Sequence, residues 1–414
     1  MLGLSSSWVN AKAELAFASR AGRALQHCRK FAFKILDVLV KLLVVRKNRE
    51  SSIIVKLDAI GDFFIWMQSG ALEITAFAKS HGNSTILLAN PSWADYARYL
   101  GLWDEIIAID PRKLARDPLY RWRHMKQVRG LGANLFIQPR SAWRPMQEDA
   151  LADVSGAKIR IGNAGTLTNL TPSSQARGNR KFSQLIRVNV DQHTHETRRN
   201  AEFVSKFLAQ DVIPFDFSRV HERCERDFVA VALGAGQNGR VWPVRKLAKL
   251  LQHVKRKQPG TVFKLLGAST ESELARQLED LIEMPMENLV GKTVVLSFVE
   301  TIAASRLVIS NDSAAFHIAM ALQKDVICFL GGGHFGWFAP YPPQANRQSR
   351  VRVLYNELEC YWCNWHCRFP RSADGSFRCV DAISLETAIE AVDSLLQKDW
   401  RYNDQTGLMR TDKR

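Results

Sequence analysis

The decisive stretch is Leu307-Val-Ile-Ser-Asn-Asp-Ser-Ala-Ala-Phe-His317, which is followed after a short apolar segment by Val326-Ile-Cys-Phe329. This pattern predicts a strand that ends at Ser310, a polar turn, a helix that begins at once and a second strand. In open α/β sheets such a turn lies at the carboxyl edge, where ligands bind. A helix beginning offers unpaired N–H groups and a positive dipole end. With Asp312 and Ser313 as cap residues and His317 one turn further in, we expect this turn to bind an anion, a diphosphate.

Outward from this unit, strand and helix patterns alternate in two cycles along the chain. The first begins near Ser52 and includes an expected helix over 63–80 and a loop over 163–182. A polar linker over 211–227 separates it from the second, which begins with a strand at 228–233. Such alternation predicts parallel sheets covered by helices on both faces. We therefore expect an α/β fold with four parts: a basic helical extension (1–50), a first domain (51–215), a second domain (226–400) and a polar tail (401–414).

The net charge of the chain, +16 over 414 residues, requires a partner of opposite sign. Nucleic acid, an anionic membrane surface and a phosphorylated substrate all qualify, and charge alone does not choose among them. The N-terminus lacks the pattern of a cleavable signal peptide. We therefore expect a reducing compartment, with Cys28, Cys224 and Cys328 as buried thiols.

Residues 31–45 are strongly apolar, but Lys34, Asp37 and Lys41 fall on one face of the expected helix. The run is short for a bilayer span and carries three charges. Two interpretations stand side by side. The helix lies in a membrane interface as a basic amphipathic element, or it packs on the body of the protein.

Four cysteines follow the spacing Cys360-x2-Cys363-x3-Cys367-x11-Cys379. Four thiolates could hold a structural zinc ion tetrahedrally, with His366 as a substitute ligand. The spacing is not that of a standard zinc ribbon, so an iron–sulfur site, two disulfides or free thiols compete with zinc.

Several segments, in order along the chain, resemble glycosyltransferase family 9, the heptosyltransferase-like proteins. They are Ile54-Val-Lys-Leu-Asp-Ala-Ile-Gly-Asp62, Gln138-Pro-Arg-Ser141 through Ile159-Arg-Ile-Gly162, His195-Glu-Thr-Arg-Arg-Asn200, Gly234 to Trp242-Pro243, Leu289-Val-Gly-Lys-Thr293 and Asn311-Asp-Ser to His317. The resemblance covers roughly residues 50 to 400. It implies the GT-B fold, in which two Rossmann-like domains face a central cleft.

Two residues are expected to be catalytic. Gly61 permits a tight turn after the first strand, and Asp62 then lies at the cleft edge, where a carboxylate can deprotonate an acceptor hydroxyl. The resemblance assigns Asp62 this general-base role; the alternative is an ordinary helix cap. Arg240 occupies a position that is usually basic in the family, where a cation offsets charge on the leaving diphosphate. Its alternative is a solvent-exposed arginine.

The remaining site residues are expected to bind the donor. By resemblance, Glu271 contacts its ribose or sugar, although a helix cap explains a glutamate there equally well. Lys292 and Thr293 bracket the base or ribose, and Gly234, Asp312, Ser313 and His317 complete the site. Ala314 departs from the glycine that is usual in the family, and its methyl group could crowd a phosphate. Gly331-Gly-Gly333-His334 either approaches the ligand closely or forms a flexible connector.

The resemblance implies an inverting glycosyltransferase that moves heptose from an ADP-linked donor to a lipopolysaccharide-core or related glycolipid acceptor. Such an enzyme is cytoplasmic and peripheral at the inner face of the bacterial inner membrane. No Asp-x-Asp metal signature stands in a convincing place, so catalysis is expected to need no cofactor, and no nucleic acid is expected as a partner. The alternatives are a nucleotide-sugar epimerase of similar fold and a basic nucleic-acid-binding protein, for which Trp122 between Arg121 and Arg123, and Trp143 beside Arg144, are the signal.

Overall fold

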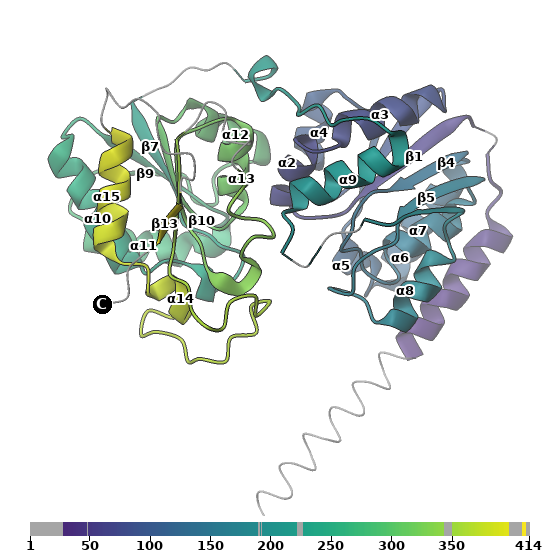
Figure 1. Cartoon of the computed structure of the whole chain (residues 1–414). Coiled ribbons are helices and arrows are strands. Elements are labelled where there is room, and N and C mark those ends of the chain that lie inside the picture. Colours follow the sequence, from purple (N-terminus) through teal and green to yellow (C-terminus); the bar gives the residue numbers. More distant parts are fainter. Residues whose placement is uncertain are drawn as a thin grey trace, which may run out of the picture.

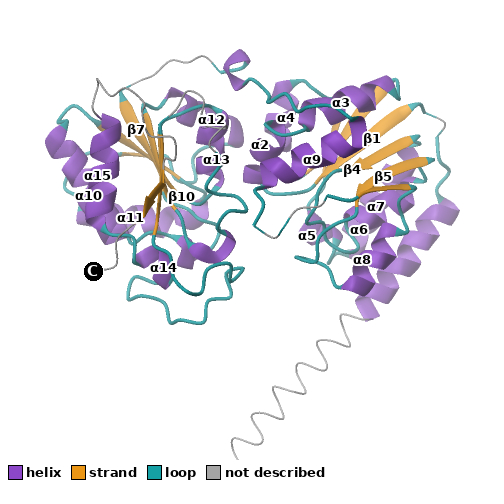
Figure 2. Ribbon diagram, viewed as in Figure 1, coloured by secondary structure: helices purple, strands orange, loops and turns teal. Residues whose placement is uncertain are grey.

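The computed structural model describes residues 28–47, 49–188, 191, 193–221, 227–342, 350–396 and 408–410. Two parallel sheets, each covered by helices on both faces, form two halves that lie side by side (Figures 1 and 2). This confirms the expected α/β architecture. Within the described residues, no helix combines the length and the apolar character that crossing a membrane requires.

The first sheet has six parallel strands in the order β3-β2-β1-β4-β5-β6. Its strands are β1 (Ser51–Lys56), β2 (Ser84–Ala89), β3 (Glu105–Ala108), β4 (Leu135–Gln138), β5 (Ile159–Asn163) and β6 (Gln184–Ile186). Its helices are α2 (Ile60–Met67), α3 (Ala71–Ser80), α4 (Ala94–Leu100), α5 (Pro111–Leu114), α6 (Pro118–Leu131), α7 (Glu148–Ser155), α8 (Pro172–Asn179) and α9 (Glu196–Leu208). The strand order reverses between β1 and β4, so a crevice opens at their carboxyl ends.

The second sheet has seven parallel strands in the order β13-β12-β11-β10-β7-β8-β9. They are β7 (Phe228–Ala232), β8 (Val262–Leu266), β9 (Glu287–Asn288), β10 (Leu307–Asn311), β11 (Val326–Phe329), β12 (Val351–Tyr355) and β13 (Leu408–Arg410). The helices are α10 (Val244–Lys257), α11 (Ser272–Leu281), α12 (Val295–Ala304), α13 (Ala314–Ala321), α14 (Arg378–Asp381) and α15 (Leu385–Leu396), with short 3-10 turns η1 (Phe217–Arg219), η2 (Asn238–Arg240), η3 (Ser269–Glu271) and η4 (Gly332–His334). Here the order reverses between β7 and β10.

Two expected elements differ in the structure. The single helix predicted over 63–80 is broken into α2 and α3 at Gly70, whose φ of +146° a side chain would resist. A Cβ at Gly70 would also lie 2.8 Å from Val204. The loop predicted over 163–182 contains α8, which the Thr171–Ser174 capping box begins.

The two ends of the chain fall partly outside the described residues. Of the predicted extension, residues 28–43 form a helix on the outer side of the first half, and residues 1–27 are not described. Of the predicted polar tail, 408–410 add strand β13 beside β12 in parallel. Of the three scattered cysteines expected to be buried thiols, Cys328 is buried as expected, Cys28 is exposed at the beginning of the helix, and Cys224 lies outside the described residues.

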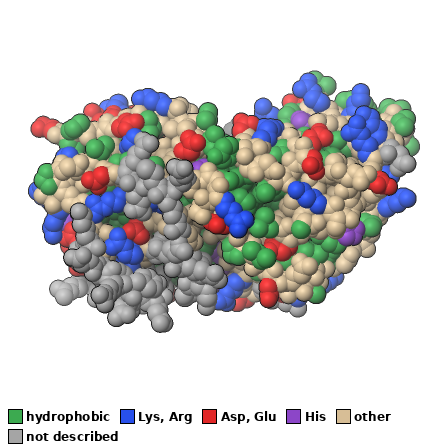
Figure 3. Space-filling model, turned by 90° about the horizontal axis from the view of Figure 1, so that it is seen from above, with side chains coloured by type: hydrophobic (Ala, Val, Ile, Leu, Met, Phe, Trp, Pro, Cys, Tyr) green, Lys and Arg blue, Asp and Glu red, His purple; other side chains and the backbone are tan. Residues whose placement is uncertain are grey.

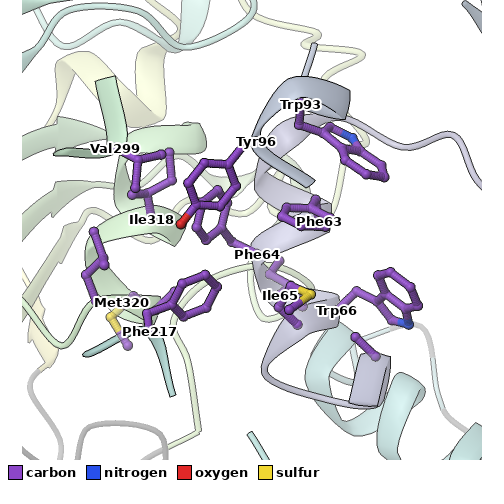
Figure 4. Close-up of a cluster of buried hydrophobic side chains, with 14 of the residues drawn as sticks. Phe63, Phe64, Ile65, Trp66, Trp93, Tyr96, Phe217, Val299, Ile318 and Met320 are labelled. Carbon is purple, nitrogen blue, oxygen red and sulfur yellow. The ribbon is translucent and has the colours of Figure 1, made fainter. Parts of the chain in front are cut away.

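A continuous apolar cluster joins the two halves (Figure 4). Phe64 of α2 stacks on Phe217 of the linker, with ring centroids 5.2 Å apart, and Tyr96 lies 5.3 Å from Phe64. Ile318 and Met320 of α13 enter the same cluster from the second half. Seen from above (Figure 3), apolar side chains gather where the two halves meet. Burial of this cluster therefore fixes α2 against α13.

Replacing Phe64 by alanine should lower the free energy of unfolding by about 3–5 kcal/mol, because a fully buried ring is lost and a cavity remains. Chemical denaturation measures the change. Leu119→Ala is the matched control, since Leu119 is 79% exposed and its loss should cost less than about 0.5 kcal/mol. Equal effects of the two variants would contradict the role given to the cluster.

Candidate active site

A cleft of about 800 Å³ opens between the halves, at the reversal points of both sheets. The predicted residues that line it are Gly61, Asp62, Gly234, Arg240, Glu271, Thr293, Asp312, Ser313 and His317. Lys292 is exposed, and its Nζ donates to the Asn288 carbonyl 2.7 Å away. The first half adds Asp58, Asn90, Arg112, Arg140 and Arg144, none of which was expected to bind the donor or to be catalytic.

Asp62 lies in the first turn of α2, not at its cap, because Ala59 occupies the cap position. The side chain is half-buried and faces the cleft. Burial, together with the negative charge of Asp58, raises the pKa of Asp62 to about 7. A carboxylate with a pKa near neutrality can accept a proton at physiological pH and release it again.

A buried charge network holds Asp58 next to Asp62. Lys56 and Asp58 form an ion pair of 2.5 Å, and Arg140 pairs with both Asp58 and Glu148. Burial opposes the charge of Asp58, yet the cations of Arg140 and Lys56 hold its pKa below the ordinary value. Asp58 therefore stays ionised, and its charge is one reason why Asp62 titrates so high.

Arg240 follows β7 on the opposite wall and is only partly exposed, which excludes the solvent-exposed alternative. One terminal nitrogen, Nη2, lies 2.6 Å from Asp312 Oδ2 and 2.8 Å from the Asp312 carbonyl. The guanidinium also lies over the Trp365 ring, 4.4 Å from its centroid. Arg240 Nε is buried, and no hydrogen-bond partner for it occurs in the described part of the chain. A fixed cation with a spare donor fits an anionic ligand.

The turn after β10 is built by side chains that bind backbone. Asn311 accepts from Trp242 N–H at 2.8 Å and donates to the Leu233 carbonyl at 2.9 Å, which ties this turn to the loop after β7. Ser313 is the N-cap of α13, and its hydroxyl lies 3.1 Å from that of Ser310. Asp312, which is expected to bind the donor, lines the cleft and pairs with Arg240. Helix geometry leaves the first N–H groups of α13 without intrahelical acceptors, and Ser313, Ala314 and Ala315 line the cleft.

His317 of α13 contacts Tyr341 in its own half and Gly61 of α2 in the first half. Its Nδ1 lies 3.1 Å from the Tyr341 hydroxyl, and burial, with a smaller contribution from Arg240, lowers the pKa of His317 to about 4. The ring is therefore neutral near pH 7. A Cβ at Gly61 would lie 2.7 Å from His317 Cδ2, so only glycine lets α2 and α13 approach this closely.

Glu271 keeps its helix-capping contacts although it lines the cleft. Its carboxylate accepts from the Ala268 N–H at 2.6 Å and from the Thr270 hydroxyl at 3.0 Å. A Cβ at Gly234 would lie 2.9 Å from the Glu271 side chain, so this glycine makes room for the acid. One carboxylate oxygen can accept several bonds, so capping leaves capacity for a ligand hydroxyl.

The glycines at 331–333 serve close packing, not flexibility. A Cβ at Gly332 would lie 2.0 Å from Tyr361, and one at Gly333 would lie 2.3 Å from Trp365. His334 follows them into the cleft, with its Nδ1 3.1 Å from Trp365 Nε1. Residues 361–365 are thus held against the wall that carries Arg240.

Residues 195–200 connect the first half to the second half through hydrogen bonds. Glu196 Oε2 accepts from Trp337 Nε1 at 3.1 Å, and the Glu196 N–H donates to the Trp337 carbonyl at 2.8 Å. His195 Nε2 lies 2.7 Å from the Phe338 carbonyl. Since Phe338 lines the cleft, these hydrogen bonds fix the position of one edge of the cleft.

The four clustered cysteines are free thiols, with Cys379 buried and the other three half-buried. The Cys379 sulfur accepts from the Gly332 N–H at 3.4 Å. Across the described residues, no three His, Cys, Asp or Glu side chains converge as a metal-binding group.

The chain is similar to proteins of one glycosyltransferase family. The model of glycosyltransferase family 9 (heptosyltransferase) matches residues 177–361. This match covers 185 of the chain's 414 residues, so it is a similarity to the family over less than half of the chain. A lipooligosaccharide heptosyltransferase 2 from Haemophilus influenzae is 24% identical over 210 residues, which are 50% of this chain and 55% of that relative. The chain thus spans about half the length of this curated relative.

Solved structures show the same fold. The E. coli ADP-heptose lipopolysaccharide heptosyltransferase II superposes with a TM-score of 0.57 at 15% identity, over 84% of this chain and 98% of that one. A family 9 glycosyltransferase from Veillonella parvula gives 0.61 at 15% identity, over 85% and 99%. The expected GT-B fold is confirmed.

The main residues of this cleft that sequence reasoning missed are Lys56, Asp58 and Arg140. A signal for the first two was present, because Lys56 and Asp58 interrupt the apolar run at the end of β1. A charged residue in a buried strand requires a partner. Arg140, 82 residues beyond Asp58, could be paired with it only once the β1–β4 register was known.

The structural zinc predicted from the cysteine spacing remains a prediction. Because the described side chains form no metal-binding group, elemental analysis of purified protein decides the prediction: about one zinc per chain, lowered in Cys363→Ser by the loss of one of four thiolates, would support it. Ser269→Ala, at an exposed position, serves as the matched control and should keep the metal. Metal-free protein with four reactive thiols would contradict the prediction.

Proposed function

We propose that this protein is an inverting glycosyltransferase that moves a sugar, heptose from an ADP-linked donor, onto a lipopolysaccharide-core or related glycolipid acceptor. One observation carries the proposal. Across a single cleft, a carboxylate with a pKa of about 7 faces an arginine with a spare buried donor and the beginning of a helix. Displacement of a diphosphate by a hydroxyl requires both a base for the hydroxyl proton and a cationic site for the leaving diphosphate.

The proposed reaction places each wall of the cleft in one role. Asp62 takes the proton from the acceptor hydroxyl as its oxygen forms the new bond to the anomeric carbon. The bond from that carbon to the diphosphate oxygen breaks on the opposite face, so the configuration inverts. Arg240 and the first N–H groups of α13 receive the charge that grows on the leaving diphosphate. Catalysis is positional and electrostatic, and no cofactor takes part.

The donor is proposed from the relatives. The curated relative is a heptosyltransferase, and one fold neighbour is described as an ADP-heptose enzyme. In this chain, Glu271 and Thr293 line the cleft. Glu271 would accept from the ribose or sugar hydroxyls, and Thr293 would lie by the base or ribose.

The acceptor is proposed from the charge of the first wall. Arg112 and Arg144 are exposed and line the cleft on the side of Asp62. Guanidinium groups in such a position bind phosphate or carboxylate groups. A phosphorylated saccharide on a lipid fits them, and it would be met at the cytoplasmic face of the bacterial inner membrane.

The structure removes most of the support for a nucleic-acid-binding function. Trp143 is fully buried, and Arg121 is fully buried in an ion pair with Asp37. Neither can belong to a surface of basic and aromatic residues that meets nucleic acid.

An epimerase would turn over the donor alone, so absence of turnover without acceptor separates an epimerase from a transferase.

Nucleotide sugars should stabilise the protein against heating. A donor at a hundred times its dissociation constant adds about 2.7 kcal/mol to the free energy of unfolding, so an ADP-linked heptose should raise the melting temperature. Asp62→Asn should keep this shift and lose transfer at least about 100-fold, because the base is removed and the donor wall is intact. No shift with any ADP-, UDP-, GDP- or CMP-linked sugar would contradict the proposal, and loss of binding in Asp62→Asn would make Asp62 a structural residue.

The pH dependence of transfer tests the base directly. Below pH 7 Asp62 is protonated and cannot accept a proton, so kcat should rise with pH through about 7. Asp58→Asn removes a negative charge beside Asp62 and leaves the cations of Lys56 and Arg140 nearby, so the pKa of Asp62 falls and the rise moves to lower pH. Asp95→Asn, at an exposed position, should leave the profile unchanged. An unmoved profile in Asp58→Asn would refute the assignment.

A further inference from the structure

The helix over residues 28–43 has two apolar faces, and only one of them packs on the protein. The inward face buries Phe33 and Val40 against the first half. Asp37 on the same face forms a 2.5 Å ion pair with the fully buried Arg121. Lys41 pairs with Asp153 at 3.1 Å, which adds a second anchor. The helix is therefore a fixed part of the body, as one of the two interpretations of its sequence held.

The opposite face is a continuous apolar surface in the structure. Phe31, Ile35, Val38 and Leu42 follow one another at spacings of four, three and four residues, so they form one stripe along the helix. Their exposed fractions are 67%, 47%, 47% and 75%. Leu39, Leu43 and Val45 widen this outer stripe, and they too are exposed. A contiguous exposed apolar surface on a fixed element marks a docking site.

Basic residues border the outer stripe. Lys30 and Lys34 lie one helical turn apart along one edge of it, and both are exposed. Arg29 stands at the beginning of the helix, with Lys47 and Arg49 just beyond its end, and these three are exposed as well. The helical positions 28–43 carry one acidic residue, Asp37, which points inward. The outward charge is therefore positive.

We propose that the outer stripe of helix 28–43 docks on an anionic lipid surface, with Phe31, Ile35, Val38 and Leu42 entering the headgroup boundary. The positive charge beside the stripe favours anionic lipid over a second copy of this chain as the partner of this face. A second copy meeting it by twofold symmetry would bring the same lysines and arginines together, whereas anionic headgroups complement them. An apolar face of this width with basic flanks is the pattern of a helix that lies in a membrane interface.

This inference deepens the proposed function and rests on it in one respect, since the proposed acceptor is a glycolipid. Because the helix is anchored through Asp37 and Arg121, docking would hold the whole first half in one orientation on the surface. The wall that carries Arg112 and Arg144 belongs to that half. A lipid-borne acceptor would then reach an enzyme that is already positioned.

Vesicle sedimentation with the full chain tests the inference. The protein should sediment with phosphatidylcholine vesicles that contain phosphatidylglycerol, and more weakly with phosphatidylcholine alone. Val38→Asn with Leu42→Asn should weaken binding to the mixed vesicles at least about tenfold, since two exposed apolar side chains are lost. The matched control is Leu167→Asn with Ile213→Asn, which changes equally exposed apolar residues elsewhere and should bind as the unaltered protein does.

A second variant separates charge from apolar insertion. Lys30→Gln with Lys34→Gln should reduce the affinity for phosphatidylglycerol vesicles about thirtyfold and leave binding to neutral vesicles unchanged. Equal binding by the Val38/Leu42 variant and its control would overturn the inference. So would a dimer of the unaltered protein that this variant dissociates, or protection of the stripe by residues 1–27 in hydrogen exchange without vesicles.

Failure of the docking and failure of the enzyme are distinguishable. The thermal shift with nucleotide sugars is measured on the same variants, and none of the altered positions lines the cleft. A donor shift without vesicle binding would sink the docking and leave the transferase standing. Vesicle binding without any thermal shift from the donor would contradict the transferase and leave the docking supported.

Discussion

The close approach of helices α2 and α13 is the constraint on which the site depends. Each helix begins at the carboxyl end of a strand next to the reversal point of its sheet, and Gly61 meets His317 where any side chain would collide. The apolar cluster around Phe64 and Met320 holds the two helices in this position. As a result, Asp62 and the turn at Asp312 open onto one cleft, although 250 residues separate them in sequence.

Electrostatics then gives the two walls different properties. On the first wall, Lys56 and Arg140 keep Asp58 ionised, and the charge of Asp58 adds to burial in raising the pKa of Asp62. On the second wall, Asp312 holds Arg240 by one nitrogen and leaves another donor unused. The proposed proton acceptor and the proposed anion site thus both depend on buried ion pairs beside the cleft.

Much of this was predictable from the sequence, and the failures have physical causes. The pattern around Asp312 predicted the strand, the turn and the helix that the structure has there, because periodicity and capping are local. Pairing across the sheet is not local, so the link from Asp58 to Arg140 could not be foreseen. The break at Gly70 depends on packing against Val204. Likewise, Arg121 and Trp143 looked like surface residues until their burial was known.

The most direct test of the account is an experimental structure with ADP bound. We expect the diphosphate to lie within about 3.2 Å of the N–H groups of Ser313 to Ala315 and of Arg240 Nε, with Asp62 facing it across the cleft. A diphosphate bound on the opposite wall, at Arg112 and Arg144, would contradict the account. So would a diphosphate that leaves Arg240 Nε without a partner.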